Sequence, residues 1–151
     1  VEGERNILSK YGNLFLGYVD LRELTLDNSS FEFDVVFPSG ITGIDNLDSV
    51  RLDFDLDGYE EATFNVRQIN IVNAPVGYSA GANASKIAVK LIGPKETIDA
   101  LSSGDIIAQV DMSTREITQT GQYKMKADII LPEGSAAWVI GSYSVTVTVK
   151  K

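Results

Sequence analysis

Residues 143–150 read YSVTVTVK, a stretch in which valine and threonine alternate. Successive side chains of a β-strand point to opposite faces of the sheet, so this alternation predicts a strand with one buried face. The same period of two occurs at residues 31–37, 50–56 and 87–91. Gly, Pro, Asn, Asp and Ser gather between these stretches, as is typical of turns. The pattern predicts a mainly β fold of mostly antiparallel sheet.

A short helix is expected at residues 94–102. Gly93-Pro94 precedes it, and proline suits the first turn of a helix. Ile98 and Leu101 are three residues apart and share one helical face, while Gly104 favours a stop. The predicted fold class is therefore β-rich α+β.

The chain repeats part of its own sequence. Residues 19–21 (VDL) return as residues 110–112 (VDM), and residues 34–40 (DVVFPSG) return as residues 128–134 (DIILPEG). The offset grows from 91 to 94 between these matches, which corresponds to small insertions in loops. These matches predict two tandem repeats with one short helix each.

The two copies differ at their beginning. The second copy owns the strands expected at residues 59–92, and the first copy has no counterpart of them. We therefore expect a partial repeat at residues 1–57, truncated at its N-terminus, and a complete repeat at residues 58–151. Residues 5–10 are the expected counterpart of the short helix. Missing strands leave an unpaired sheet edge, which predicts that two copies of the chain can dimerise through it.

The bulk composition excludes several functions. The net charge is −8 and the pI is about 4.5, so the surface repels nucleic acids and anionic bilayers. The chain has no cysteine and no apolar run long enough to span a membrane, so no direct membrane insertion is expected. No phosphate-binding loop or zinc pattern is present, and we expect no cofactor.

An ordered set of motifs resembles the bacterial YbbR-like domain family. The set comprises residues 89–94 (VKLIGP), 108–112 (AQVDM), 121–123 (GQY), 130–134 (ILPEG) and 145–149 (VTVTV). The resemblance covers nearly all of residues 59–151 and, more loosely, residues 1–57.

This resemblance implies a non-catalytic module that occurs in tandem, outside the cytoplasmic membrane, in a membrane-anchored parent protein. It also implies regulation of a membrane diadenylate cyclase, the enzyme that makes cyclic di-AMP, through protein–protein contact. The alternative is a structural spacer or scaffold repeat of a cell-envelope protein, because both roles need only stable β-modules.

Residues 77–81 spell G-x-S-x-G, the nucleophile motif of serine hydrolases. A nucleophilic Ser79 would need a general base, usually histidine, and the chain contains none. The motif also requires a strand-to-helix turn, whereas a further strand is expected here. We interpret the motif as a Gly-Ser loop and expect that the protein is not an enzyme.

Asp53, Asp55 and Asp57 are candidate calcium ligands, since residues 53–58 spell D-x-D-x-D-G. The twelfth position of such a loop would be Phe64 instead of glutamate. The alternative is a strand with an acidic solvent face that ends in an Asp-Gly turn.

Asp20 and Asp111 occupy matching places in the two copies. They belong to different repeats, so each is expected to cap a turn instead of joining in one catalytic pair. Trp138 lies among small and apolar residues. It is a candidate interface anchor for a partner protein, or alternatively a lid over the core.

Overall fold

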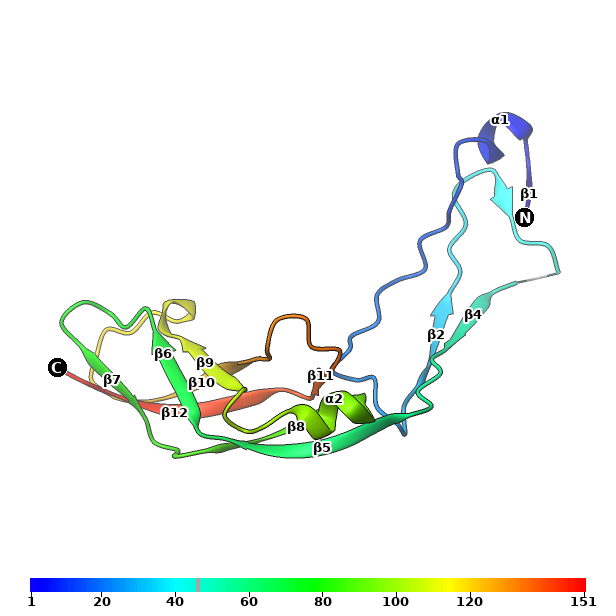
Figure 1. Ribbon diagram of the computed structural model, residues 1–151. Coiled ribbons are helices and arrows are strands. Elements are labelled where there is room, and N and C mark those ends of the chain that lie inside the picture. The colour runs from blue at the N-terminus through cyan, green and yellow to red at the C-terminus, as the bar shows by residue number, and fades with distance from the viewer. Residues whose placement is uncertain (46) are drawn as a thin grey trace.

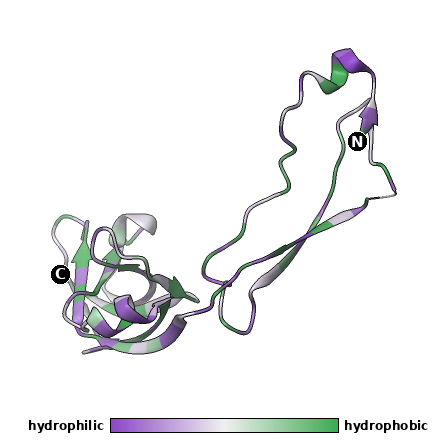
Figure 2. Cartoon of the chain, turned by 45° about the vertical axis from the view of Figure 1, so that its right-hand side comes forward, coloured by the Kyte–Doolittle hydropathy of each residue, from purple (hydrophilic) through white to green (hydrophobic). Residues whose placement is uncertain are grey.

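The computed structural model describes residues 1–45 and 47–151, and it divides the chain into two parts of different character. Residues 58–151, the body, form two sheets with a helix packed against them (Figure 1). Residues 1–57, the arm, extend away from the body as a long loop that returns on itself. The arm projects well clear of the sheets in both Figure 1 and Figure 2.

The larger sheet of the body has five strands in the order β6-β9-β10-β12-β7. Their bounds are Gln68–Val72 (β6), Ser79–Ala82 (β7), Ile107–Asp111 (β9), Gly121–Ile130 (β10) and Tyr143–Lys150 (β12). Strand β10 pairs with β12 through its first seven residues and with β9 through its last three, antiparallel in both cases. Strands β6 and β9 run parallel.

The smaller sheet has the order β11-β8-β5 and is antiparallel throughout. Its bounds are Tyr59–Val66 (β5), Ile87–Pro94 (β8) and Trp138–Ile140 (β11). Helix α2 (Lys95–Ala100) follows β8 and buries Ile98, and a 3-10 helix, η1 (Met112–Thr114), follows β9. No helix in the described part of the chain is long and apolar enough to cross a membrane.

The alternating valines of β12 form part of the core. Val145, Val147 and Val149 are each at most 4% exposed, and they pack into a buried cluster on the five-stranded sheet. A second cluster lies between the smaller sheet and α2. Tyr143 packs against both clusters, and its hydroxyl donates to the carbonyl of Ile140 and accepts the N–H of Lys90, both at 2.8 Å. The two clusters thus form one connected interior.

The Gly-Pro motif before α2 has a steric cause. A Cβ at Gly93 would lie 2.8 Å from the Cβ of Ala137 and 2.9 Å from its Cα. Only glycine therefore allows β8 to approach the segment leading into β11 this closely.

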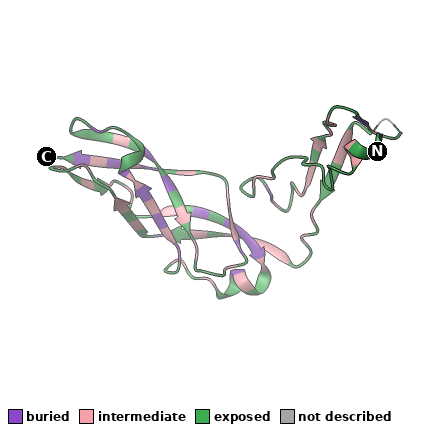
Figure 3. Ribbon diagram, turned by 90° about the horizontal axis from the view of Figure 1, so that it is seen from above, coloured by how far each residue is buried: buried purple, intermediate pink, exposed green. Residues whose placement is uncertain are grey.

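Within residues 1–45 and 47–57, the arm forms two short two-stranded pairings and one helical turn. Its elements are β1 (Glu2–Gly3), α1 (Arg5–Leu8), β2 (Ser30–Asp34), β3 (Ile41–Thr42) and β4 (Ser49–Asp53). Strand β1 pairs with β3 and β2 pairs with β4, both antiparallel. Leu24 and Ile41 are the only buried hydrophobic residues in the described part of the arm. Figure 3 shows the contrast, with the buried positions concentrated in the body.

The predicted fold class is confirmed: the chain is mainly β and mostly antiparallel, with two short helices. Helix α2 lies within the expected residues 94–102, and α1 lies within residues 5–10. Strand β4 ends at Asp53, earlier than the alternation over residues 50–56 indicated, because its ladder with β2 ends at the pair Ser30–Asp53. The division into a partial and a complete repeat stays a prediction.

Candidate interaction surface

Trp138 stands where the arm meets the body. It is the only tryptophan of the chain and is half-buried. Its ring centroid lies 5.7 Å from that of Tyr59, with the two planes tilted by 50°. Its indole N–H donates to the carbonyl oxygen of Leu24 at 3.1 Å. The structure therefore places this candidate interface residue at a contact between two segments of one chain.

The contact between residues 20–28 and the body is called the joint. Leu24, 2% exposed, is the buried hydrophobic residue of this segment. The N–H of Gly141 donates to the carbonyl of Arg22 at 3.0 Å, and the N–H of Leu26 donates to Glu61 Oε1 at 3.0 Å. With the Trp138 bond these make three hydrogen bonds, each contributing about 1 kcal/mol. The arm is thus held by a small number of modest interactions.

Glu61 is the ionised group of the joint. The ammonium of Lys90 forms an ion pair with its carboxylate, whose side chain is only 15% exposed. This bond and the N–H of Leu26 hold the pKa of Glu61 below its ordinary value, although partial burial opposes them. The carboxylate therefore stays charged and keeps its acceptor oxygen available to the arm.

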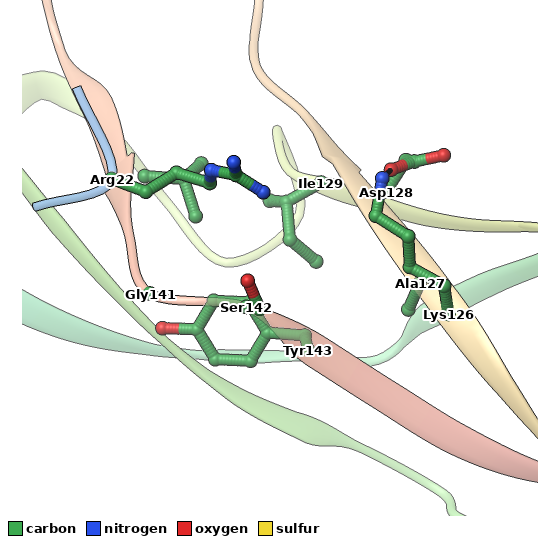
Figure 4. Close-up of a pocket in the computed structure, with 9 residues that line it drawn as sticks. Arg22, Lys126, Ala127, Asp128, Ile129, Gly141, Ser142 and Tyr143 are labelled. Carbon is green, nitrogen blue, oxygen red and sulfur yellow. Dashed lines mark ion pairs between the residues drawn. The ribbon is translucent and has the colours of Figure 1, made fainter. Parts of the chain in front are cut away.

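A small pocket of about 170 Å³ lies beside the joint, between Arg22 of the arm and strands β10 and β12 (Figure 4). Its charged groups are already paired. Lys126 lies 2.6 Å from Asp128, and the Arg22 guanidinium holds Asp20 at 2.9 Å, which lowers the pKa of Asp20 to about 2. The pocket therefore offers no uncompensated charge to a ligand.

The large exposed apolar residues are concentrated on the arm. Of the fourteen in the described chain, twelve lie in residues 1–57, and Val76 and Ile130 are the two on the body. Tyr18 is 88% exposed, Val36 80% and Phe15 69%. Exposed apolar side chains in this number are available for contact with another molecule.

The net charge is also confined to the arm. Residues 1–57 contain twelve acidic and four basic residues, whereas residues 58–151 contain nine of each. The arm therefore carries the whole net charge of −8, and the body is neutral. An acidic arm attracts positively charged partners and repels anionic ones.

Ser79 of the G-x-S-x-G motif is the first residue of strand β7, which pairs with the end of β12. Its hydroxyl donates to the carbonyl of Lys150 at 3.5 Å. A strand here differs from the strand-to-helix turn that exposes the serine of a hydrolase. Nothing in this arrangement activates the hydroxyl.

The three candidate calcium ligands do not converge. Asp53 accepts bonds from the hydroxyl of Ser30 and from Arg51 Nε, the latter at 2.7 Å. Asp55 instead accepts the backbone N–H of Asp57 at 3.0 Å. Across residues 1–45 and 47–151, no group of three or more His, Cys, Asp or Glu side chains is placed to hold a metal ion. Gly58 has a φ of 79°, as the Asp-Gly turn requires.

Asp20 and Asp111 make the same local contact in different parts of the chain. Asp20 accepts the N–H of Arg22 at 3.0 Å, and Asp111 accepts the N–H of Ser113 at 2.9 Å. Each therefore caps a turn, as predicted, and the structure does not bring them together.

Two features escaped reasoning from the sequence. The partner of Trp138 is Leu24, 114 residues away, and no local pattern indicates a contact at that separation. The confinement of the charge to the arm is visible in the sequence once the boundary near Gly58 is known. The signal was present, but the total of −8 conceals it.

No protein-family model and no curated protein matches the chain. Among solved structures, the chain is similar to the YbbR-like domain of the lmo2119 protein from Listeria monocytogenes, a 1.32 Å crystal structure. The identity is 14% and the TM-score 0.45, over 60% of this chain and 93% of that chain.

Proposed function

We propose that this protein is a non-catalytic interaction module that binds a protein partner through its arm. The observation that carries the proposal is the apolar surface of the arm, which holds twelve of the fourteen exposed large hydrophobic residues of the described chain. Burying such surface is the dominant favourable term in protein association. The body serves as a rigid platform, because its core is closed and its charges balance.

The partner that we propose is a membrane diadenylate cyclase, whose activity the module would regulate. The support is the resemblance of the motifs at residues 89–94, 108–112 and 130–134 to the YbbR-like family. In this proposal the module works outside the cytoplasmic membrane, within a membrane-anchored parent. Regulation then corresponds to a coupling free energy between binding of the module and activity of the cyclase.

The second candidate is a structural spacer in an envelope protein. Its support is the shape of the chain, since the arm extends from one end of the body and the C-terminus lies at the other (Figure 1). A spacer needs length and stability and requires no specific partner. The two candidates therefore differ in whether a specific, saturable contact exists.

Site-specific crosslinking of the parent protein in its own cells tests both. A photo-crosslinking amino acid would replace Val36 of the arm, which is 80% exposed, and, as the matched control, Val76 of the body, which is 100% exposed. Both positions are exposed valines, so the probe disturbs neither the core nor the charge.

Recovery of a diadenylate cyclase from the Val36 position, and not from Val76, is the expected result. Recovery of envelope components alone from Val36 would favour the spacer function and would refute the cyclase proposal. Equal background from both positions would refute a partner contact at this part of the arm, and the cyclase proposal with it.

A further inference from the structure

Strands β2 and β4 form a two-stranded ribbon whose apolar face is only partly covered, by Gly17 against the ring of Phe33 and by Phe54 against that of Phe31. Phe31 and Phe33 of β2 pair with Leu52 and Val50 of β4, and none of the four is buried. The valines of β12 have the same alternation and are buried. An isolated two-stranded ribbon is marginally stable in water. The ribbon therefore has the alternation of a core strand, but its apolar face is incompletely packed.

The hydrogen bonds at the ends of the ribbon define its free edge. Val35 N–H donates to the carbonyl of Asp48, and Phe54 N–H donates to the carbonyl of Ser29, both at 2.8 Å. Because bonded pairs alternate along an antiparallel ladder, the backbones of Val50 and Leu52 face β2. Those of Ser49, Arg51 and Asp53 face outward from β4. Figure 1 shows this outer side of β4 turned away from residues 10–20.

The arm exposes apolar side chains along its length, from residue 1 to residue 52. Its twelve exposed large hydrophobic residues are between 36% and 88% exposed. Leu52, 42% exposed, is the one that lies in the ribbon, and it offers an apolar contact beside the free edge of β4.

Charge selects the occupant of this edge. Residues 47–57, which contain β4, carry four aspartates and one arginine. Two such edges could pair with Arg51 of one copy opposite Asp53 of the other, but the net charge of −3 on each disfavours a second copy of the chain. An anionic lipid surface is repelled for the same reason. A strand rich in lysine or arginine is attracted by the net charge of −3 that residues 47–57 carry.

We propose that the outer edge of β4 accepts a strand from a basic protein partner, which adds to the ribbon through the outward backbone groups of Ser49, Arg51 and Asp53. Cationic side chains of that strand face the aspartates of residues 47–57, and its apolar side chains extend the face formed by Val50 and Leu52. This inference rests on the proposed interaction function and names the surface and the chemistry of its partner.

The test uses the full chain and three synthetic octapeptides labelled with a fluorophore. One alternates lysine with valine, the second glutamate with valine, and the third lysine with serine. Fluorescence anisotropy is measured at 50 mM and 300 mM NaCl. We expect saturable binding of the lysine–valine peptide alone, weakened several-fold by the higher salt. Equal binding of the lysine–serine peptide would show charge attraction without strand addition and would overturn the proposal.

The matched variants are Arg51→Pro and Arg51→Ala. Both lose the same cation, and only proline removes the outward N–H, at a position where the ribbon itself does not use it. We expect Arg51→Pro to weaken peptide binding at least tenfold relative to Arg51→Ala. Equal affinities would overturn the proposal, provided that exchange protection of the Val35 amide shows an intact ribbon in both variants.

A charge-reversed variant keeps the test decisive where proline disturbs the ribbon. Asp48→Lys with Asp55→Lys changes two exposed side chains and no strand N–H. We expect this variant to lose binding of the lysine–valine peptide and to gain binding of the glutamate–valine peptide. An unchanged preference for the lysine–valine peptide would overturn the proposal. Sedimentation of the wild-type chain as a dimer that Arg51→Pro dissociates would also overturn it, since the occupant would then be a second copy.

These results are separable from those of the crosslinking experiment. If the peptides do not bind but the Val36 crosslink succeeds, the proposal for the β4 edge is refuted and the proposed interaction module stands. If the crosslink fails but the lysine–valine peptide binds, the cyclase proposal is refuted and the proposal for the β4 edge stands.

Discussion

Replacing Leu24 with alanine should open the joint without unfolding the body. Leu24 is 2% exposed and is the only buried residue among residues 20–28. Leucine-to-alanine substitution at buried sites costs about 3 kcal/mol. The three hydrogen bonds of the joint together contribute about 3 kcal/mol. The lost packing is thus comparable to all the polar interactions there, and it shifts the open-to-closed equilibrium roughly 150-fold.

The assay uses Trp138, because it is the only tryptophan and lies in the joint. Opening exposes its indole to water, so the emission maximum of the Leu24→Ala variant should move to longer wavelength. Hydrogen exchange should accelerate at the amides of Leu26 and Gly141, which donate across the joint. The calorimetric unfolding midpoint of the body should change little, since sixteen of the eighteen buried hydrophobic residues of the described chain lie there.

Leu21→Ala is the matched control, because Leu21 belongs to the same turn and is 49% exposed. It should leave the emission and the exchange rates of the joint unchanged. An unshifted emission maximum in Leu24→Ala, or a single transition in which arm and body unfold together at a lower temperature, would refute this account of the joint.

Three other predictions concern packing, pH and metal ions. Gly93→Ala should lower the free energy of unfolding by about 2 kcal/mol in chemical denaturation, because its Cβ would meet Ala137 at 2.8 Å; unchanged stability would mean that the two strands separate freely. The lowered pKa of Glu61 means that its contribution to stability is complete above its ordinary value of 4.5 and is lost as the pH falls through the lowered value. An NMR titration of the Leu26 amide should therefore show a midpoint below 4.5, and a midpoint above it would contradict the ion pair. Millimolar calcium should produce no calorimetric heat and no shift of the melting temperature, since the aspartates of residues 53–57 do not converge; a saturable heat would show that they rearrange around the ion.

The strands were predictable where local alternation and burial agree. In β12 the period of two indicated the strand, and its valines lie in the core. Helix α2 was predictable from Gly93-Pro94 and Gly104, because these residues act locally. The parallel pairing of β6 with β9 was not predicted, since parallel neighbours are distant in sequence and their register depends on tertiary packing.

Alternation in β2 and β4 indicated strands and misled about burial. Phe31 and Phe33 alternate as the valines of β12 do, yet they remain partly exposed. A sequence pattern records which face is apolar, and burial also requires a second layer to cover that face. Trp138 shows the same limit, because its apolar surroundings left anchor and lid open and no local pattern indicated its bond to Leu24, 114 residues away. Its role as an interface anchor stays a prediction.

The positions of β5 and β12 determine how the molecule would bear tension between the arm and its C-terminus. Force applied to the arm acts on the body at the start of β5, and force applied to the C-terminus acts at the end of β12. Both strands run roughly along the line that joins the arm to the C-terminus (Figure 1). The β5–β8 ladder has eight residue pairs loaded in shear, so its bonds must break together. The β1–β3 ladder has two pairs and the joint has three hydrogen bonds. The chain is therefore a compliant element in series with a stiff one, in which the arm lengthens before the body yields.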